Sequence, residues 1–332
     1  MNVVAAADQV VATLRDAARV LLVTHTHPDG DALGSLTALR LALDHIGTPV
    51  DVFQSEEDLV LPDELEPFRA EAPVDESTVR FDDRVVVFLD CGNASRSTLG
   101  GRLEEMGTIV NIDHHHDNTG FGTINLLDFD ASSTAEIVWD LVGRLGAPLT
   151  EPIAEALYVG LITDTGRFSY ENTTPRAHQM AAELLAAGID VTAIRRRLYE
   201  DIGPGKLHLL RYALDSFVLH GGGSVISARI TAADFDAAGA TEAQSEGIID
   251  VIRGVRGVRI AALARELETR AGSFKVSLRA ADPTVDVSAI ARAGGGGGHP
   301  QAAGFVTQLS DAGLAEFLLA QLAEQDAAVS SV

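Results

Sequence analysis

Short, almost wholly apolar segments that alternate with helical patterns constrain the fold of this chain most strongly. ARVLLVT (18–24), RVVVFLD (84–90) and GTIVNID (107–113) contain mainly apolar residues, as do strands buried on both faces of a parallel sheet. PVDVFQ (49–54) and a shorter TINLL (123–127) predict two further strands. The apolar spacing between and after these segments predicts helices over 32–46, 132–146, 151–162 and 174–188.

This alternation predicts an α/β fold, with a doubly wound, mainly parallel sheet over residues 1–190. A Gly-Pro-Gly break follows, and we interpret residues 191–209 as a helical linker. Residues 210–332 predict a smaller α+β domain. Its strands are expected to be antiparallel, over 224–231, 257–268 and 273–281, with helices near 244–253, 286–293 and 310–325.

Composition narrows the possible functions. The formal net charge of −23 argues against a protein that grips long nucleic acid, because such proteins present a basic face to the phosphates. The single cysteine, Cys91, excludes an intrachain disulfide and a zinc site with several thiolates. No apolar run approaches the ~20 residues that span a bilayer. Charged residues interrupt the apolar pattern of the first 20 residues, which predicts an amphipathic helix rather than a cleaved signal, and hence a cytoplasmic protein.

Acidic and histidine side chains follow three of the predicted strands. Ligands bind open parallel sheets beyond the carboxyl ends of the strands, where these side chains would meet. A further aspartate follows the apolar helical run that ends before TDTG. The candidates are His25, His27, Asp29, Asp31, Asp90, Asp113, His114, His115, His116 and Asp164.

Each of these residues has an ordinary explanation when taken alone. An aspartate at the end of a strand is commonly a cap or turn former, and a lone histidine is commonly a hydrogen-bonded surface or core residue. Their convergence favours a metal site, because closely packed carboxylates repel one another unless cations neutralise them. Aspartate and histidine without thiolates suit Mn²⁺, with Mg²⁺ or Co²⁺ as alternatives. The number of candidates exceeds what one ion needs, so we expect two divalent ions.

Ordered motifs give the chain a recognisable resemblance. HTHPDGDALGS, FLDCGN, DHHH and TDTG resemble the motifs of the DHH phosphoesterase superfamily, in the same order. GGGGHPQAAG, with SLRA before it, resembles the signature of the DHH-associated domain of the first type. With this two-domain length, the chain is most similar to the nanoRNase/pAp-phosphatase group.

The resemblance implies a role for each matching residue. His25 and Asp29 would bind one metal ion, while Asp31, His114 and Asp164 would bind the second. Asp90 would bridge both ions. His115 would contact or protonate the phosphoryl group, and Asp113 would orient a histidine. Among the remaining residues of these motifs, His27 and His116 receive no ligand role, and Asn93 and Arg96 are possible phosphate contacts.

The glycine run in the second domain has two interpretations. In isolation, five consecutive glycines predict a flexible linker. The histidine, proline and small residues that follow favour a close approach of backbone to a phosphate instead. The resemblance points to the second interpretation. The candidate substrate-binding residues are Arg279, Gly296, Gly297, Gly298 and His299.

The resemblance also implies a reaction. The expected enzyme hydrolyses short RNA, linear dinucleotides such as pApA, and 3′-phosphoadenosine 5′-phosphate (PAP), through a hydroxide that bridges two metal ions. A cyclic-dinucleotide phosphodiesterase is an alternative that the sequence leaves open. A single-strand exonuclease of the RecJ type is less favoured, because such enzymes usually carry a further nucleic-acid-binding domain. A homodimer is expected from the family alone.

Overall fold

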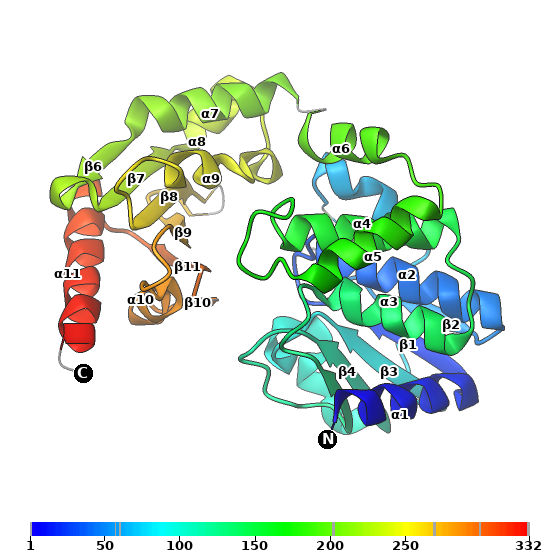
Figure 1. Cartoon of the computed structure of the whole chain (residues 1–332). Coiled ribbons are helices and arrows are strands. Elements are labelled where there is room, and N and C mark those ends of the chain that lie inside the picture. The colour runs from blue at the N-terminus through cyan, green and yellow to red at the C-terminus, as the bar shows by residue number, and fades with distance from the viewer. Residues whose placement is uncertain are drawn as a thin grey trace. The chain divides into compact units, whose positions relative to one another are not determined.

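The computed structural model describes residues 2–56, 58–59, 61–200, 203–267, 270–298 and 300–330. The chain forms two compact units, Met1–Asp201 and Ile202–Val332 (Figure 1). Within the segment predicted as a linker, α6 (Val191–Tyr199) belongs to the first unit and α7 (Pro204–Ser216) to the second. The domain limits at 190 and 210 stay predictions. In the described part of the chain, no helix is long and apolar enough to cross a membrane.

The first unit is built on a sheet of five parallel strands in the order β2-β1-β3-β4-β5. The strands are β1 (Arg19–Val23), β2 (Val50–Val52), β3 (Arg84–Leu89), β4 (Thr108–Asp113) and β5 (Ile124–Leu127). All five lie within the segments predicted as strands, and the expected α/β class is confirmed. The chain leaves β1 for one neighbour and later returns to the other, so a topological switch point lies between β1 and β3. Ligand sites in open α/β sheets form at such a point.

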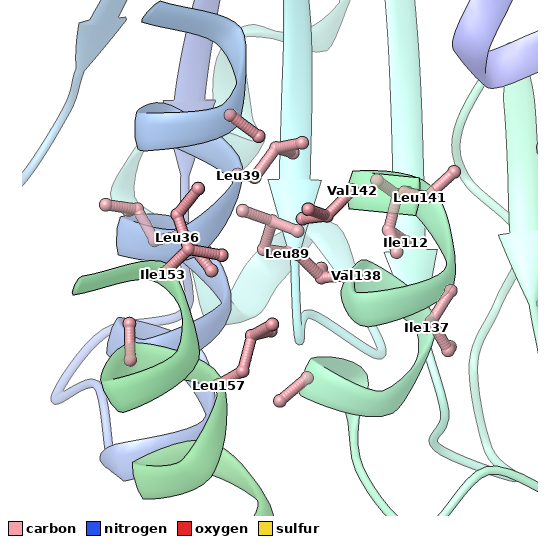
Figure 2. Packing of buried hydrophobic residues seen from close by; sticks show 14 of the residues in the cluster. Leu36, Leu39, Leu89, Ile112, Ile137, Val138, Leu141, Val142, Ile153 and Leu157 are labelled. Carbon is pink, nitrogen blue, oxygen red and sulfur yellow. The ribbon is translucent and has the colours of Figure 1, made fainter. Parts of the chain in front are cut away.

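Helices cover one face of this sheet. They are α1 (Val3–Asp16), α2 (Gly30–Ile46), α3 (Thr134–Leu145), α4 (Glu151–Asp164) and α5 (Pro175–Ala186). Figure 2 shows their apolar side chains meeting those of the strands, among them Leu36, Leu39, Leu89, Ile112, Val138, Leu141 and Leu157. Fully burying one such side chain stabilises the fold by about 1.5–3 kcal/mol. The opposite face is covered by loops and by the 3₁₀ helix η3 (Thr98–Glu105).

Glycines allow α2 and α4 to pack very closely. A Cβ on Gly34 would lie 2.4 Å from the Ala156 carbonyl oxygen. A Cβ on Gly160 would lie 2.8 Å from Asp31 Oδ1 and 2.7 Å from the Ala135 Cβ. This close packing holds the start of α2 against the start of α3, where much of the site described below is assembled.

The second unit contains a mixed sheet in the order β10-β11-β9-β8-β7-β6. Its strands are β6 (Val218–His220), β7 (Val225–Ile230), β8 (Ile260–Glu266), β9 (Phe274–Ala280), β10 (Gly297–Gly298) and β11 (Ala302–Thr307). The helices α7, α8 (Ala232–Ala238) and α9 (Ile248–Arg253) cover one face, and α10 (Val287–Ala293) and α11 (Asp311–Ser330) cover the other.

The prediction of an antiparallel arrangement was wrong for one strand pair, because β7 and β8 are parallel. Parallel neighbours need a long crossover, and α8 and α9 supply it between these two strands. The β6, β10 and β11 strands and the α8 helix were not predicted. Strands as short as β6 and β10, and the glycine-rich segment around β10 and β11, carry weak periodic signals.

Candidate metal centre

Aspartate and histidine side chains from several elements of the first unit meet at the carboxyl edge of its sheet. There are three groups of residues in which the possible ligand atoms of each group lie within 4.8 Å of one another: His25 with Asp29 and Asp90, Asp31 with His114 and Asp164, and Asp90 with His114 and His115. Asp90 belongs to two groups and so connects them. Every metal ligand proposed from the sequence lies in this cluster.

His25, two residues beyond β1, presents a buried ring nitrogen to the cluster. Its Nδ1 is 2.9 Å from the Thr26 carbonyl oxygen, so this nitrogen carries the proton and donates it to the carbonyl. Its Nε2 lies 3.4 Å from Asp90 Oδ2 and 4.0 Å from Asp29 Oδ1, and makes no hydrogen bond with any residue that the structure describes. A buried ring nitrogen that faces two carboxylates without a hydrogen bond is poorly satisfied by the protein itself. This arrangement fits a bound cation.

The start of α2 supplies two carboxylates with different surroundings. Asp29 is the N-cap of α2 and accepts from the amides of Asp31 and Ala32, while its side chain remains largely exposed. Asp31 is buried, and its two oxygens accept from the amides of Thr134 and Ala135 at 2.7 and 2.9 Å. Asp31 therefore joins α2 to the positive N-terminus of α3.

Asp90 lies at the centre of the cluster. It follows β3 with φ = 58°, a left-handed conformation that aspartate tolerates better than most residues. Its Oδ1 accepts a hydrogen bond of 2.8 Å from the Thr134 hydroxyl and lies 3.8 Å from His114 Nε2. Burial alone would raise the pKa of Asp90, but contact with His25 and the nearby charge of His115 lower it. The carboxylate is therefore ionised. Its two oxygens face different histidines, Oδ2 toward His25 and Oδ1 toward His114.

The end of β4 supplies two histidines with separate environments. His114 Nε2 lies 3.6 Å from Asp164 Oδ2, so this ring faces the carboxylates. His115 Nδ1 contacts Asp113 Oδ1 at 2.5 Å, and Asp113 in turn accepts from Asn118. Burial lowers the pKa of His115, but the hydrogen bond with Asp113 and the charge of Asp90 raise it to about 9. Asp113 thus orients the His115 ring.

The electrostatics of the cluster favour a cation. Burial and the charges of Asp90 and Asp164 raise the pKa of Asp31 well above its usual range. Burial and the charges of Asp90 and Asp29 do the same to the pKa of Asp164. Carboxylates in this state repel one another, and divalent ions would relieve that repulsion. The residues present therefore fit divalent metal ions.

Several supporting residues were missed by the sequence analysis. Thr134 bonds Asp90 through its hydroxyl and Asp31 through its amide. Asn172 donates to Asp164 Oδ2 at 3.1 Å and to the Ser132 carbonyl at 2.8 Å. Asn118 holds Asp113. The run Ser132-Ser133-Thr134 marks a helix start in the sequence, but its contact with Asp31, about a hundred residues earlier in the chain, depends on the tertiary fold.

The remaining motif residues of the first unit lie outside the three ligand groups. His27 is exposed, and its amide donates to Asp58. The His116 ring lies at a tilt against the Phe129 ring, with centroids 5.6 Å apart. Asn93 caps a short 3₁₀ helix, and the Arg96 carbonyl accepts the Thr26 amide at 2.7 Å. Among the described residues, no carboxylate forms an ion pair with the Arg96 guanidinium.

The candidate substrate residues of the second unit lie on neighbouring strands. Arg279 on β9 pairs with Ala302 on β11, and Ala303 pairs with Gly298 on β10. Gly296 has a structural role, because its amide donates to the Ala291 carbonyl near the end of α10. A Cβ there would also lie 2.0 Å from the Gly304 oxygen. His299 lies outside the described residues.

A parallel α/β sheet with carboxylates and histidines at its switch point suits the class of metal-dependent hydrolases that act on phosphate esters. Comparisons with known proteins specify the family. Residues 19–161 match the model of the DHH family, N-terminal domain, and residues 222–325 match the DHHA1 domain. The bifunctional oligoribonuclease and PAP phosphatase NrnA of Thermus thermophilus is 34% identical over 287 residues, covering 86% of this chain and 83% of that protein. The chain belongs to the DHH family of phosphoesterases.

Further relatives agree with this assignment. The bifunctional oligoribonuclease and PAP phosphatase NrnA of Bacillus subtilis is 27% identical, with 86% of this chain and 88% of that protein covered. The crystal structure of an exopolyphosphatase-related protein from Bacteroides fragilis aligns with a TM-score of 0.85 at 24% identity, covering 96% of each chain. RecJ from Thermus thermophilus in complex with Mn²⁺ aligns with a TM-score of 0.54, covering 98% of this chain and 54% of RecJ, at 17% identity. These structures support the fold.

Proposed function

We propose that this protein hydrolyses short oligoribonucleotides and linear dinucleotides to 5′-mononucleotides, and PAP to AMP. The observation that carries the proposal is the set of three ligand groups at the switch point of the sheet, in which Asp90 is shared by two groups and His114 by two. The names of the relatives with the same two domains support this class of substrate. The net charge of −23 also favours short substrates, because a few local arginines can hold two or three phosphates without a basic surface.

We assign two divalent ions, Mn²⁺ by preference, to this cluster. His25 and Asp29 would hold one ion, Asp31, His114 and Asp164 the other, and Asp90 would contact both. When bound, such ions supply Lewis acidity that polarises a phosphoryl oxygen and acidifies a water molecule. The protein contributes a rigid arrangement, because Thr134 and the α3 amides already fix two of the carboxylates.

Two further residues of the first unit act on the phosphate in this proposal. His115, whose ring Asp113 orients through Nδ1, would contact or protonate a phosphoryl oxygen. Arg96 supplies a guanidinium whose charge acts on His25 and His115. It would bind a non-bridging phosphate oxygen.

The second unit would bind the remainder of the substrate through Arg279, Gly297, Gly298 and His299. Gly297 and Gly298 are exposed, and Gly298 has φ = 141°, which favours glycine. The Arg279 side chain is about one quarter exposed, and its Nε lies 3.9 Å from Asp250 Oδ1. That distance leaves the guanidinium capable of a charge-assisted hydrogen bond to a phosphate.

One panel of reactions tests the proposal. Purified protein with Mn²⁺, Mg²⁺ or Co²⁺ is given pApA, RNA of several short lengths, PAP, cyclic di-AMP and a long single-stranded DNA. We expect turnover of pApA, the shortest RNAs and PAP. Faster turnover of cyclic di-AMP than of pApA would replace the proposal with the cyclic-dinucleotide alternative. Inactivity toward every phosphoester with all three metals would refute the enzymatic proposal.

The assembly and location of the protein are proposals of the same kind. We propose a cytoplasmic homodimer. Light scattering coupled to size-exclusion chromatography tests the dimer against the monomer mass of 35.0 kDa. Fractionation of cells that produce the native chain tests its location.

A further inference from the structure

The loop between β1 and α2 bends at His27, and contacts with two other segments hold it there. The His27 backbone has φ = 54°, a left-handed conformation that residues other than glycine adopt rarely. Its amide donates to Asp58 Oδ1 at 2.8 Å, and the preceding amide, of Thr26, donates to the Arg96 carbonyl at 2.7 Å. A backbone in this conformation persists where the surrounding structure enforces it, and it concentrates at functional sites.

Asp58 is a buried carboxylate in the loop that follows β2, and only 5% of the residue is exposed. Because β2 pairs with β1 in parallel, this loop lies at the same edge of the sheet as the loop after β1. Oδ2 of Asp58 accepts from the Ser55 hydroxyl at 2.7 Å and from the Ser55 amide at 3.2 Å, within its own loop. Oδ1 accepts from His27, outside that loop. In the part of the chain that the structure describes, the loop after β2 supplies none of the candidate metal ligands, yet it supports a loop that does.

One peptide joins Asp58 to a candidate metal ligand. The N–H of the Thr26–His27 peptide donates to Asp58, and the carbonyl of the same peptide accepts from His25 Nδ1 at 2.9 Å. With Nδ1 held in this way, Nε2 of the ring faces Asp90 Oδ2 at 3.4 Å. Histidines that bind metal ions usually donate their other N–H to a carboxylate or a backbone carbonyl, which fixes the orientation of the ring. Asp58 holds the peptide whose carbonyl does this for His25.

Asp29, the other candidate ligand of this loop, is held by different contacts. Its Oδ1 accepts from the amides of Asp31 and Ala32 at 3.0 and 3.1 Å, so α2 itself fixes this carboxylate. A disturbance at the Thr26–His27 peptide should therefore reach the metal centre through His25 rather than through Asp29.

We propose that Asp58 is a positioning residue for the metal centre and that it acts on His25 through the Thr26–His27 peptide. Asp58 orients the His25 ring without contacting a metal ion or the substrate. Of the two ions assigned to the cluster, the one that His25 would hold depends on Asp58. The two parts of His27 then differ in importance, because its backbone amide is needed while its exposed ring is not.

This inference rests on the proposed function, through the assignment of two ions, and its main test needs no substrate. Mn²⁺ is titrated calorimetrically into the metal-free wild type and into Asp58→Ala and Asp58→Asn. Gln54→Ala is the matched control, because Gln54 is also buried in the loop after β2 but accepts from the Ala70 amide, at 2.9 Å. Urea unfolding of each metal-free variant separates a loss of stability from a loss of affinity. Steady-state kcat and KM for pApA are then measured over a range of Mn²⁺ concentrations.

We expect Asp58→Ala to weaken one of two bound Mn²⁺ ions by about 10- to 100-fold, as is typical for a residue that orients a metal ligand. The other ion should stay within about twofold of wild type. Lower kcat at limiting Mn²⁺ should recover as Mn²⁺ is raised, with KM for pApA nearly unchanged. Asp58→Asn should regain most of the affinity, because its amide oxygen can still accept from the His27 amide. Gln54→Ala should bind both ions as wild type does, even where urea unfolds it more easily.

A double-mutant cycle tests the route through His25. In a His25→Ala background, Asp58→Ala should change Mn²⁺ affinity by less than about twofold, because the ring that Asp58 orients is missing. Independent, additive losses would overturn the inference. So would wild-type Mn²⁺ affinity in Asp58→Ala, an equal loss in Asp58→Asn, or an equal loss in Gln54→Ala. Failure of the proposed function is a different result, in which the wild type binds Mn²⁺ but turns over no phosphoester.

Discussion

The two units present their candidate functional residues in opposite settings. In the first unit, the aspartates and histidines converge from distant parts of the chain, and all of them except Asp29 are buried or half-buried. In the second unit, Arg279 and the glycines lie on adjacent strands, and the glycines are exposed. A buried and mutually constrained site suits chemistry that needs fixed geometry. An exposed strand surface suits recognition of a variable ligand.

The two units also differ in whether their carboxylates are paired with basic side chains. Asp31 and Asp164 have raised pKa values, so ionising both carboxylates costs free energy in the metal-free protein. In the second unit, Arg259 lies between Asp282 and Asp326, at 2.6 and 2.9 Å, and each carboxylate forms an ion pair with it. The first arrangement favours binding of cations at the expense of stability. The second contributes to stability and carries no function that we propose.

The largest expected effect is that of Asp90→Asn. Because Asp90 joins two of the ligand groups, its loss should lower kcat by well over ~10²-fold, more than the loss of a supporting residue. Calorimetric titration with Mn²⁺ should show weaker binding. Asp44→Asn, at an exposed aspartate of α2, is the control and should behave as wild type. Retention of most of the activity by Asp90→Asn would refute the assignment of a shared ligand.

The two histidines of the HTH sequence provide the next test. His25→Ala removes a buried nitrogen that faces two carboxylates, and kcat should fall by about 10²-fold together with Mn²⁺ affinity. His27→Ala removes an exposed ring and should change kcat by less than about threefold. Equal losses in the two variants would mean that the cluster extends to His27.

A smaller effect is expected from Thr134→Val, which removes the hydrogen bond to Asp90 but keeps the backbone contact with Asp31. Residues that orient a metal ligand typically contribute 10- to 100-fold, and we expect about tenfold in kcat. Thr134→Ser, which keeps the hydroxyl, should restore most of this loss. Equal kcat values for Thr134→Ser and Thr134→Val would mean that the hydrogen bond from the hydroxyl to Asp90 does not contribute to kcat.

The second unit should respond in KM rather than in kcat. Arg279→Ala should raise KM for pApA about tenfold and leave kcat nearly unchanged, because a recognition contact acts equally on substrate and transition state. Arg292→Ala removes another, more exposed arginine of the same unit and is the control. A fall in kcat with unchanged KM would contradict the contrast between the units.

The smallest effect concerns stability. Hydrogen bonds from Thr284 and Arg259 lower the pKa of Asp282 to about 2, below its unfolded value of about 3.9. Its contribution is therefore present above pH ~4 and disappears as the pH falls through about 2. Asp282→Asn should reduce the free energy of unfolding by less than about 1 kcal/mol at pH 7. Urea denaturation at pH 7 and pH 3 should show a smaller difference at pH 3.

The strands of the first unit could be predicted from the sequence because both of their faces are buried, which leaves unbroken apolar runs. The candidate ligands could be predicted because each lies near the end of such a strand or helix. The parallel pairing of β7 with β8 could not, since residue periodicity does not report strand direction. The contacts of Thr134, Asn118 and Asn172 could not be predicted from the sequence either, because their partners depend on how the chain folds.

The sequence by itself determined which residue types are available and where the strands of the first unit end. It therefore fixed the candidate ligands and the resemblance to the DHH family. The tertiary structure decided how these residues are used. Close packing at Gly34 and Gly160 brings α2 against α3 and α4, so that Asp31 accepts the first amides of α3 while Asp90 accepts from the Thr134 hydroxyl. Such contacts arise from helix packing over long sequence distances, which local pattern cannot specify.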